Sequence, residues 1–224
     1  MPPDAVRLPG AAWSGRPGVS ACACFGGRDR LDFLPVKEGQ KLGIVYHPRR
    51  PQARVLAEEL AHRVGAGERA VWVCPVWEEE APRQNIEGTQ VLVAVGGDGT
   101  ILRAAHIVMP RAIPILGVNL GNLGFLAELR PEEALERLPA LLAGEGQIEE
   151  RAMLRVEVAP QASAVARQRA AYLDGAFHAL NDVVVNRGAI LRVIYVDVEV
   201  DGAPFVTYKG DGALVATATG STGY

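Results

Sequence analysis

The sequence predicts an α/β N-terminal domain with a parallel sheet, followed by a β-rich second domain that is incomplete. Three observations support this fold class. Between about Lys41 and Gly144, short apolar runs alternate with helical periodicities, as in strands joined by crossover helices. Residues 91–95 contain no polar side chain, which is typical of a parallel strand buried on both faces. From Gln147 onward, β-forming runs follow one another with no helical period between them.

The strands of the first domain are predicted at residues 42–46, 70–76, 90–95 and 113–118. The first strand stops at His47, and Pro51 then opens a helix with an apolar residue at every fourth position. A second helix follows the third strand and ends before Pro110. A third helix begins at Pro131, and Pro139 is expected to kink or split it.

The domain boundaries follow from changes in this pattern. Residues 1–38 mix Pro, Gly, Arg and small residues without periodicity, so they are expected to be disordered or to be an over-extended translation start. Residues 39–146 then form the α/β domain. Residues 147–224 form the β-rich domain, with strands expected at 154–158, 177–185 and 190–200.

Composition indicates an ordinary soluble globular protein, with 49% hydrophobic residues and a net charge of −3. Without a basic run, nucleic acid is not an expected partner. No apolar stretch reaches the ~20 residues that span a bilayer, so a membrane is not expected either. Three cysteines cannot all pair, and no further Cys or His cluster completes a zinc site with Cys22 and Cys24. A reducing cytoplasm and no protein-held metal site are therefore expected.

The first of four motifs with chemical character is Gly96-Gly97-Asp98-Gly99-Thr100, directly after the third strand. Its glycines let the backbone turn sharply and approach a bulky anion. Backbone amides at the start of the next helix would face that anion. The alternative is a tight turn in which Asp98 only caps the helix. No P-loop and no dinucleotide fingerprint after the first strand are present, which excludes a Walker-type NTPase and an ordinary dinucleotide oxidoreductase.

The second motif, at residues 119–126, follows the fourth strand, at the edge where open α/β sheets bind ligands. Its Phe125 could stack on a ligand ring or pack in the core. The third motif is Asn181-Asp182, whose amide and carboxylate suit ribose hydroxyls if the backbone bends there, so that the strand begins at Val183. A solvated turn is the alternative. The fourth, at residues 209–224, is a short strand followed by small hydroxyl residues and glycines, suited to a diphosphate and sugar or to a low-complexity loop.

One charged residue outside these motifs is also a candidate. Arg192 is predicted to share a strand face with Ile194, Val196 and Val198. A charge without a partner is unfavourable on such an apolar face. The position therefore indicates a binding role.

In order and spacing, the four motifs resemble those of the NAD kinase family from about Lys41 to Tyr224. The glycine turn alone is shared with lipid kinases and phosphofructokinases. The resemblance implies transfer of a phosphoryl group from ATP, with Mg²⁺ or another divalent metal, to the 2′-hydroxyl of the adenosine ribose of NAD. It implies that Asp98 is the catalytic base and that the phosphate loop comprises Gly96, Gly97 and Thr100. The substrate-binding residues it implies are Gly99, Arg103, Phe125, Asn181, Asp182, Arg192, Lys209, Asp211, Thr219, Thr222, Gly223 and Tyr224.

Two other functions remain open at this point: a lipid kinase of the diacylglycerol type that uses the same turn, and a catalytically silent NAD-binding module. Polyphosphate is an alternative phosphoryl donor. A homo-oligomer is expected, of a size that these residues do not specify. The fourth motif stops at Tyr224, where Ser221 and Thr222 signal a helix start. The chain is therefore expected to be incomplete and weakly active or inactive as written.

Overall fold

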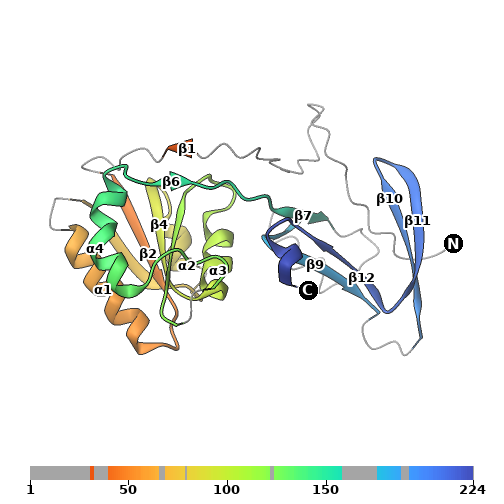
Figure 1. Cartoon of the computed structure of the whole chain (residues 1–224), viewed down its shortest axis with the longest axis horizontal. Coiled ribbons are helices and arrows are strands. Elements are labelled where there is room, and N and C mark those ends of the chain that lie inside the picture. The colour runs from red at the N-terminus through yellow and green to blue at the C-terminus, as the bar shows by residue number, and fades with distance from the viewer. Residues whose placement is uncertain are drawn as a thin grey trace. The chain divides into compact units, whose positions relative to one another are not determined.

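The structure, a computed structural model, describes residues 31–32, 40–65, 69–78, 80–121, 124–157, 176–187 and 192–223. The chain divides into two compact units between Glu149 and Glu150 (Figure 1). The first unit is α/β and the second consists of antiparallel strand pairs, so the predicted fold class is confirmed.

The first unit is built on a parallel four-stranded sheet in the order β3-β2-β4-β5. Its strands are β2 (Lys41–Tyr46), β3 (Val71–Pro75), β4 (Thr89–Gly96) and β5 (Ile115–Asn119). Its helices are α1 (Pro51–Gly65), α2 (Glu80–Asn85), α3 (Asp98–Val108) and α4 (Pro131–Leu142). A short antiparallel pair joins β1 (Leu31–Asp32) to β6 (Gln147–Ile148). All four predicted strands and three predicted helices are present, whereas the short α2 was not predicted.

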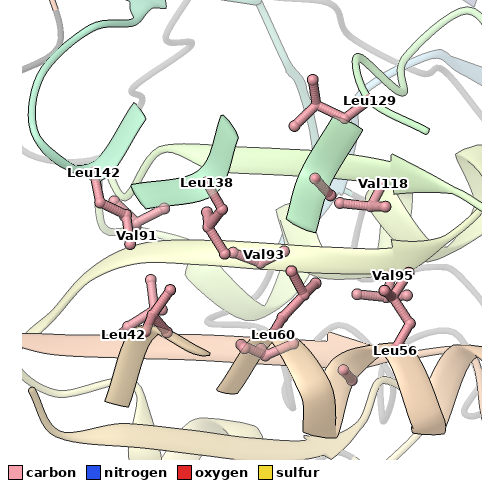
Figure 2. Close-up of a cluster of buried hydrophobic side chains, with 14 of the residues drawn as sticks. Leu42, Leu56, Leu60, Val91, Val93, Val95, Val118, Leu129, Leu138 and Leu142 are labelled. Atoms are coloured by element: carbon pink, nitrogen blue, oxygen red, sulfur yellow. The ribbon is translucent and has the colours of Figure 1, made fainter. Parts of the chain in front are cut away.

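Helices cover both faces of this sheet (Figure 1). Neighbouring residues of a strand point to opposite faces, so Val93 packs with α1 and α4 while Leu92 packs with α3. Figure 2 shows the first of these two layers. Every residue of β4 except Gln90 is buried, as predicted for a strand covered on both faces. Full burial of one such aliphatic side chain stabilises the fold by about 1.5–3 kcal/mol. The packing of β4 therefore holds the strand ends in place.

Helix α4 runs unbroken through Pro139, so of the two expected effects, a kink or a split, the split is wrong. Proline has no N–H to donate to the carbonyl of Leu135. The side chain of Arg63, on α1, donates a hydrogen bond to that carbonyl instead. Leu138 and Leu142 are buried against the sheet and hold the helix on both sides of the proline.

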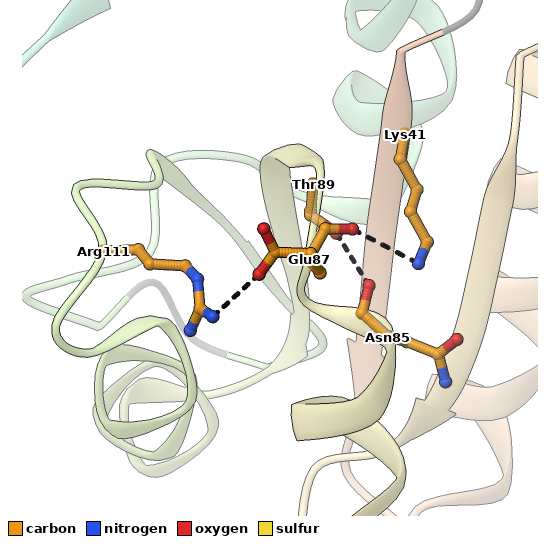
Figure 3. A network of polar contacts seen from close by, with 5 residues as sticks. All are labelled: Lys41, Asn85, Glu87, Thr89 and Arg111. Carbon is orange, nitrogen blue, oxygen red and sulfur yellow. Dashed lines mark hydrogen bonds and ion pairs between the residues drawn. The ribbon is translucent and has the colours of Figure 1, made fainter.

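Polar contacts tie together the amino-terminal edge of the sheet (Figure 3). Arg111, after α3, pairs with Glu87 at 2.9 Å, and the amino group of Lys41 lies 3.5 Å from the Glu87 carbonyl oxygen. The hydroxyl of Thr89 donates to the Asn85 carbonyl at 3.1 Å. Exposed ion pairs contribute little stability, so these contacts mainly fix loops at the edge opposite the glycine turn.

The strand order places a change of direction between β2 and β4. From β2 the chain moves to β3 on one side, and it then crosses to β4 on the other side of β2. Ligands of open α/β sheets bind at the carboxyl ends of the strands where this reversal occurs. Tyr46 pairs with Val95, and Gly96 with Asn119, so the ends of three strands meet at this edge.

The described residues of the second unit form three antiparallel pairs. They join β7 (Leu154–Glu157) to β8 (Ala176–Ala179), β9 (Asp182–Asn186) to β12 (Gly212–Ala216), and β10 (Ile194–Val200) to β11 (Ala203–Gly210). A 3-10 turn, η1 (Gly220–Gly223), follows β12. The strand predicted over 177–185 is two strands, because the backbone bends at residues 180–181 and each half pairs with a different partner.

Candidate functional site

The glycine turn lies between β4 and α3, with Gly97 as the N-cap residue of the helix. The Gly97 N–H donates to the hydroxyl of Thr100 at 3.4 Å, and the Thr100 N–H donates to the Gly97 carbonyl at 2.8 Å. Only 2% of Thr100 is exposed, so its hydroxyl fixes the turn. The Thr100 hydroxyl is thus used inside the turn, and the place of Thr100 in the phosphate loop stays a prediction. A Cβ at Gly96 would lie 2.1 Å from that hydroxyl oxygen, which explains the glycine there.

Asp98 does not cap α3, so the alternative in which it only caps the helix is wrong. It is the first residue of the helix, and its half-buried carboxylate turns toward the loop after β5. One oxygen accepts a hydrogen bond from the N–H of Phe125 at 3.0 Å, and the other accepts one from Leu126 at 3.2 Å. These bonds fix the plane of the carboxylate and leave each oxygen with further acceptor capacity.

Gly124 makes this arrangement possible. A Cβ at this position would lie 2.2 Å from one Asp98 oxygen and 2.6 Å from its carboxyl carbon. The Leu120 N–H also donates to the Gly96 carbonyl at 2.9 Å. The first two motifs, predicted as separate features, are thus one structure closed around a carboxylate.

Two residues of this structure are open to a ligand. Phe125 is 83% exposed, so the alternative of a core-packing phenylalanine is wrong within this unit. Gly99 is exposed on α3, and a Cβ there would meet no atom within 4 Å. In the described part of the chain, packing therefore does not explain why this residue is a glycine.

A group of basic and aromatic residues lies at the same edge. His47 directly follows β2, and its N–H bonds to the Val95 carbonyl at 3.0 Å. Its ring lies 5.1 Å from that of Trp77, centroid to centroid. The guanidinium carbons of Arg49 and Arg103 lie 4.5 and 5.5 Å from the Trp77 ring centroid. Of these four, only Arg103 was predicted as a binding residue.

In the second unit the third and fourth motifs also interlock. The Thr217 N–H donates to the Asn181 carbonyl at 2.8 Å. The Thr217 hydroxyl, 7% exposed as a residue, donates to the Leu180 carbonyl at 2.6 Å and accepts from the Gly220 N–H at 3.0 Å. A Cβ at Gly220 would lie 2.2 Å from the Asn181 carbonyl oxygen. Thr217 was not identified as a site residue from the sequence, because a hydroxyl residue among small residues gives no sign that it is buried.

The condition set for the third motif, a backbone bend at Asn181, is met. Asn181 lies in the bend, and Asp182 begins β9 opposite Ala216, so the strand starts one residue earlier than the predicted Val183. Both side chains are half-buried, and Asp182 has a polar partner of its own. The loop after β12 is therefore anchored on the backbone of the Asn-Asp motif.

Three charged candidates lie on the surface of the second unit. The amino group of Lys209, on β11, lies 5.8 Å from the Tyr195 ring centroid. Asp211, between β11 and β12, pairs with Arg187 at 3.2 Å. Arg192 is exposed in a bend that precedes β10. The prediction that Arg192 shares an apolar strand face is therefore wrong, because the strand begins two residues later.

The remaining candidates belong to the loop after β12. The Thr219 hydroxyl accepts a hydrogen bond from Arg151 at 3.3 Å. The Thr222 hydroxyl, in η1, donates to the Thr219 carbonyl at 3.4 Å. Gly223 ends η1, and Tyr224 lies outside the described residues.

Two further features bear on chemistry. Burial and, to a smaller extent, the nearby Glu78 carboxylate together raise the pKa of the Cys74 thiol from 9.0 to about 12, so Cys74 is a protonated, unreactive thiol at neutral pH. Among the described residues, no group of three or more His, Cys, Asp or Glu side chains could hold a metal ion. No helix in the described ranges is long and apolar enough to cross a membrane.

Comparison with known proteins gives consistent matches over most of the chain. Residues 54–146 match the family model for the ATP-NAD kinase N-terminal domain, and residues 180–224 match that for the ATP-NAD kinase C-terminal domain. An NAD kinase of Dehalococcoides mccartyi is 46% identical over 185 residues, which cover 83% of this chain and 62% of the relative. An NAD kinase of Moorella thermoacetica is 37% identical over 194 residues, which cover 83% of this chain and 58% of the relative.

Yeast NADH kinase, in a crystal structure with NADH, has a similar fold. The TM-score is 0.63 at 21% sequence identity, and the match covers 83% of this chain and 60% of the yeast chain. This chain spans 62% of the length of the Dehalococcoides relative.

Proposed function

Because the chain belongs to the NAD kinase family, we propose that it transfers a phosphoryl group from ATP to the 2′-hydroxyl of the adenosine ribose of NAD, giving NADP. The observation that carries the proposal is the Asp98 carboxylate, held by the N–H groups of Phe125 and Leu126 at the edge where the strand order reverses. A carboxylate fixed in this way is suited to orienting a hydroxyl group.

In the proposed mechanism, Asp98 orients the ribose hydroxyl for in-line attack on the γ-phosphorus of ATP and accepts its proton. The bond from that phosphorus to the bridging oxygen breaks, and ADP leaves. A carboxylate is a weak base for an alcohol. However, phosphoryl transfer has a loose transition state, so positioning contributes more than basicity. The two backbone hydrogen bonds supply that positioning, because they hold the carboxylate before the substrate arrives.

The remaining residues are proposed to bind the two substrates. The amide of Gly99, at the start of α3, and the guanidinium of Arg103 offer positive charge to phosphate, and Gly97 leaves room for it because a Cβ there would meet only an ordinary contact. Asn181 and Asp182 would hold a ribose of NAD, with further contacts from the exposed residues of the second unit and from the loop after β12, namely Arg192, Lys209, Asp211, Thr219, Thr222, Gly223 and Tyr224. A divalent metal such as Mg²⁺ would neutralise the phosphates of ATP, and the Asp98 carboxylate has acceptor capacity left for such a metal.

The proposal also includes a cellular location and an oligomeric state. A cytoplasmic location is supported by the free, buried Cys74, since reduced thiols are the rule in that compartment. We also retain the expectation of a homo-oligomer. The lipid-kinase alternative is not favoured, because the family models match both units of the chain.

The test is formation of NADP from NAD, ATP and Mg²⁺ by the full chain, with Asp98→Asn as the control variant. NADP formation by the wild-type chain alone supports the proposal. Binding of NAD without NADP formation would instead identify a silent module, and phosphorylation of diacylglycerol without NADP formation would identify a lipid kinase.

A further inference from the structure

Basic and aromatic side chains from three separate segments gather at the carboxyl ends of β2 and β3. We call them the Trp77 cluster: His47, Arg49, Trp77 and Arg103. Arg49 and Arg103 approach the Trp77 ring at 4.5 and 5.5 Å, and the His47 ring is tilted by 60° against it. The two arginines come from the loop after β2 and from α3, so the sheet itself brings them to one ring.

The two arginines of this cluster have no ion-pair partner among the described residues. Both Arg49 and Arg103 are exposed. Arg54, by comparison, pairs with Glu58 at 2.7 Å on the neighbouring helix. Two guanidinium groups drawn to one ring repel each other and lose side-chain entropy. An anion between or beside the two guanidinium groups would stabilise this arrangement by offsetting their repulsion.

The cluster begins at the glycine turn. A Cβ at Gly96 would lie 3.2 Å from the Cβ of His47. Arg103 follows Asp98 by five residues on α3, which corresponds to about 7.5 Å along the helix axis. Positive charge therefore extends from the turn along this edge, as a short chain of phosphates requires when its terminal group lies at Asp98.

We infer that the Trp77 cluster binds the phosphate chain of the phosphoryl donor, with Arg49 as a phosphate contact that Trp77 holds in place. This inference rests on the proposed function and adds a donor subsite to it. The planar guanidinium fork matches phosphate oxygens in pairs, and stacking on a ring orders the fork before the ligand binds. Because guanidinium groups already stack on the ring, the site recognises phosphate charge and not a nucleobase, so ATP and inorganic polyphosphate would bind alike.

Isothermal titration of the full chain with inorganic tripolyphosphate tests the subsite directly. Arg49→Gln should raise the dissociation constant about tenfold, the effect of one lost charge-assisted hydrogen bond. Trp77→Leu should raise it several-fold, and Trp77→Phe should restore much of the affinity because a ring is present again. The matched control is Arg137→Gln, which removes the same charge from the exposed face of α4. Thermal melting monitored by circular dichroism establishes that each variant is folded.

Steady-state kinetics then separate the donor subsite from the NAD site. Arg49→Gln should raise KM about tenfold for both ATP and tripolyphosphate and should leave KM for NAD within about twofold. The inference is overturned if Arg137→Gln weakens tripolyphosphate binding as much as Arg49→Gln does. It is also overturned if only the KM for ATP, or only that for NAD, changes. Absence of NADP formation would bear on the proposed function and on the expected inactivity of the chain as written, whereas the titration alone decides the inference.

Discussion

Replacement of Gly124 by alanine tests whether the closure around Asp98 is required for activity. The added methyl carbon would lie 2.2 Å from an Asp98 oxygen and 2.6 Å from the carboxyl carbon, which is closer than nonbonded atoms approach. Either the carboxylate must rotate or the loop that carries Phe125 and Leu126 must move away. Both adjustments weaken the two hydrogen bonds at 3.0 and 3.2 Å.

The size of the effect follows from those bonds. A hydrogen bond to a charged group contributes about 1.5–3 kcal/mol, and the half-exposed position of Asp98 reduces that value because water replaces part of the bond. We therefore expect Gly124→Ala to lower the free energy of unfolding by about 1–3 kcal/mol. Turnover should fall by at least about 10²-fold, because misplacement of a catalytic group by ~1 Å has effects of that order.

Gly99→Ala is the matched control, since it adds the same methyl group one residue from Asp98. Its Cβ would meet no atom within 4 Å, and the residue lies in the first turn of α3. Alanine in a helix is more favourable than glycine by about 0.5–1 kcal/mol, so this variant should be as stable as the wild type or more stable. Gly99→Ala serves as a control for stability alone, because Gly99 is itself a proposed binding residue. Urea unfolding compares the two variants, and the NADP assay compares Gly124→Ala with the wild type. Equal stability of the two variants, or wild-type turnover of Gly124→Ala, would refute the proposed closure.

Three other outcomes are expected. Asp98→Asn should leave the fold and NAD binding nearly unchanged while turnover falls ~10²–10⁴-fold, and more than a tenth of wild-type turnover would rule out its role as base. Replacement of Asn181 and Asp182 by alanine should weaken NAD binding by roughly 1–3 kcal/mol in a titration, with little change in melting temperature; unchanged affinity would favour the solvated turn. The Cys74 thiol, with a pKa of about 12 in the fold, should react with thiol reagents only after unfolding. Its stabilising effect is complete below pH ~9 and is lost as the pH rises toward 12, a pH dependence that Cys74→Ala should lack in urea unfolding.

The elements of the first unit could be predicted because their signals are local. Strand β4 is buried on both faces, which produces its continuous apolar run. Helix α1 is buried on one face, which produces its four-residue spacing of apolar residues. The six-residue α2 is too short to show a period. The hairpin of β10 and β11 did have a signal: Asp201-Gly202 adopts φ of 53° and 79°, and Asp-Gly is a preferred pair for such a turn. The sequence analysis predicted one strand over residues 190–200 and did not identify the turn that follows it.

The contacts of the candidate site could not be predicted in the same way. The bond between Asp98 and Phe125 spans 27 residues, and it depends on β4 and β5 being neighbours in the sheet. Trp77 follows β3 on the far side of β2, so nothing near it in the sequence indicates that Arg103 will reach it. Strand order, which the periodicity leaves open, decides both contacts.

The structure also changes the meaning of the glycines in these motifs. They were interpreted as openings for an anion, yet Gly96 is required by the Thr100 hydroxyl. In the same way, Gly124 makes room for the Asp98 carboxylate, and in the second unit Gly220 packs on the backbone of Asn181.

In each unit, then, a glycine of one motif lets another motif approach it, and these glycines position groups without touching a ligand. Gly97 and Gly99 differ, because a Cβ at Gly97 would make only an ordinary contact at 3.8 Å and one at Gly99 would make none within 4 Å. Among the described residues, nothing steric requires glycine at these two positions. They are therefore a stronger argument for a bound anion than Gly96, Gly124 and Gly220 are. A side chain there would displace a ligand while leaving the fold intact.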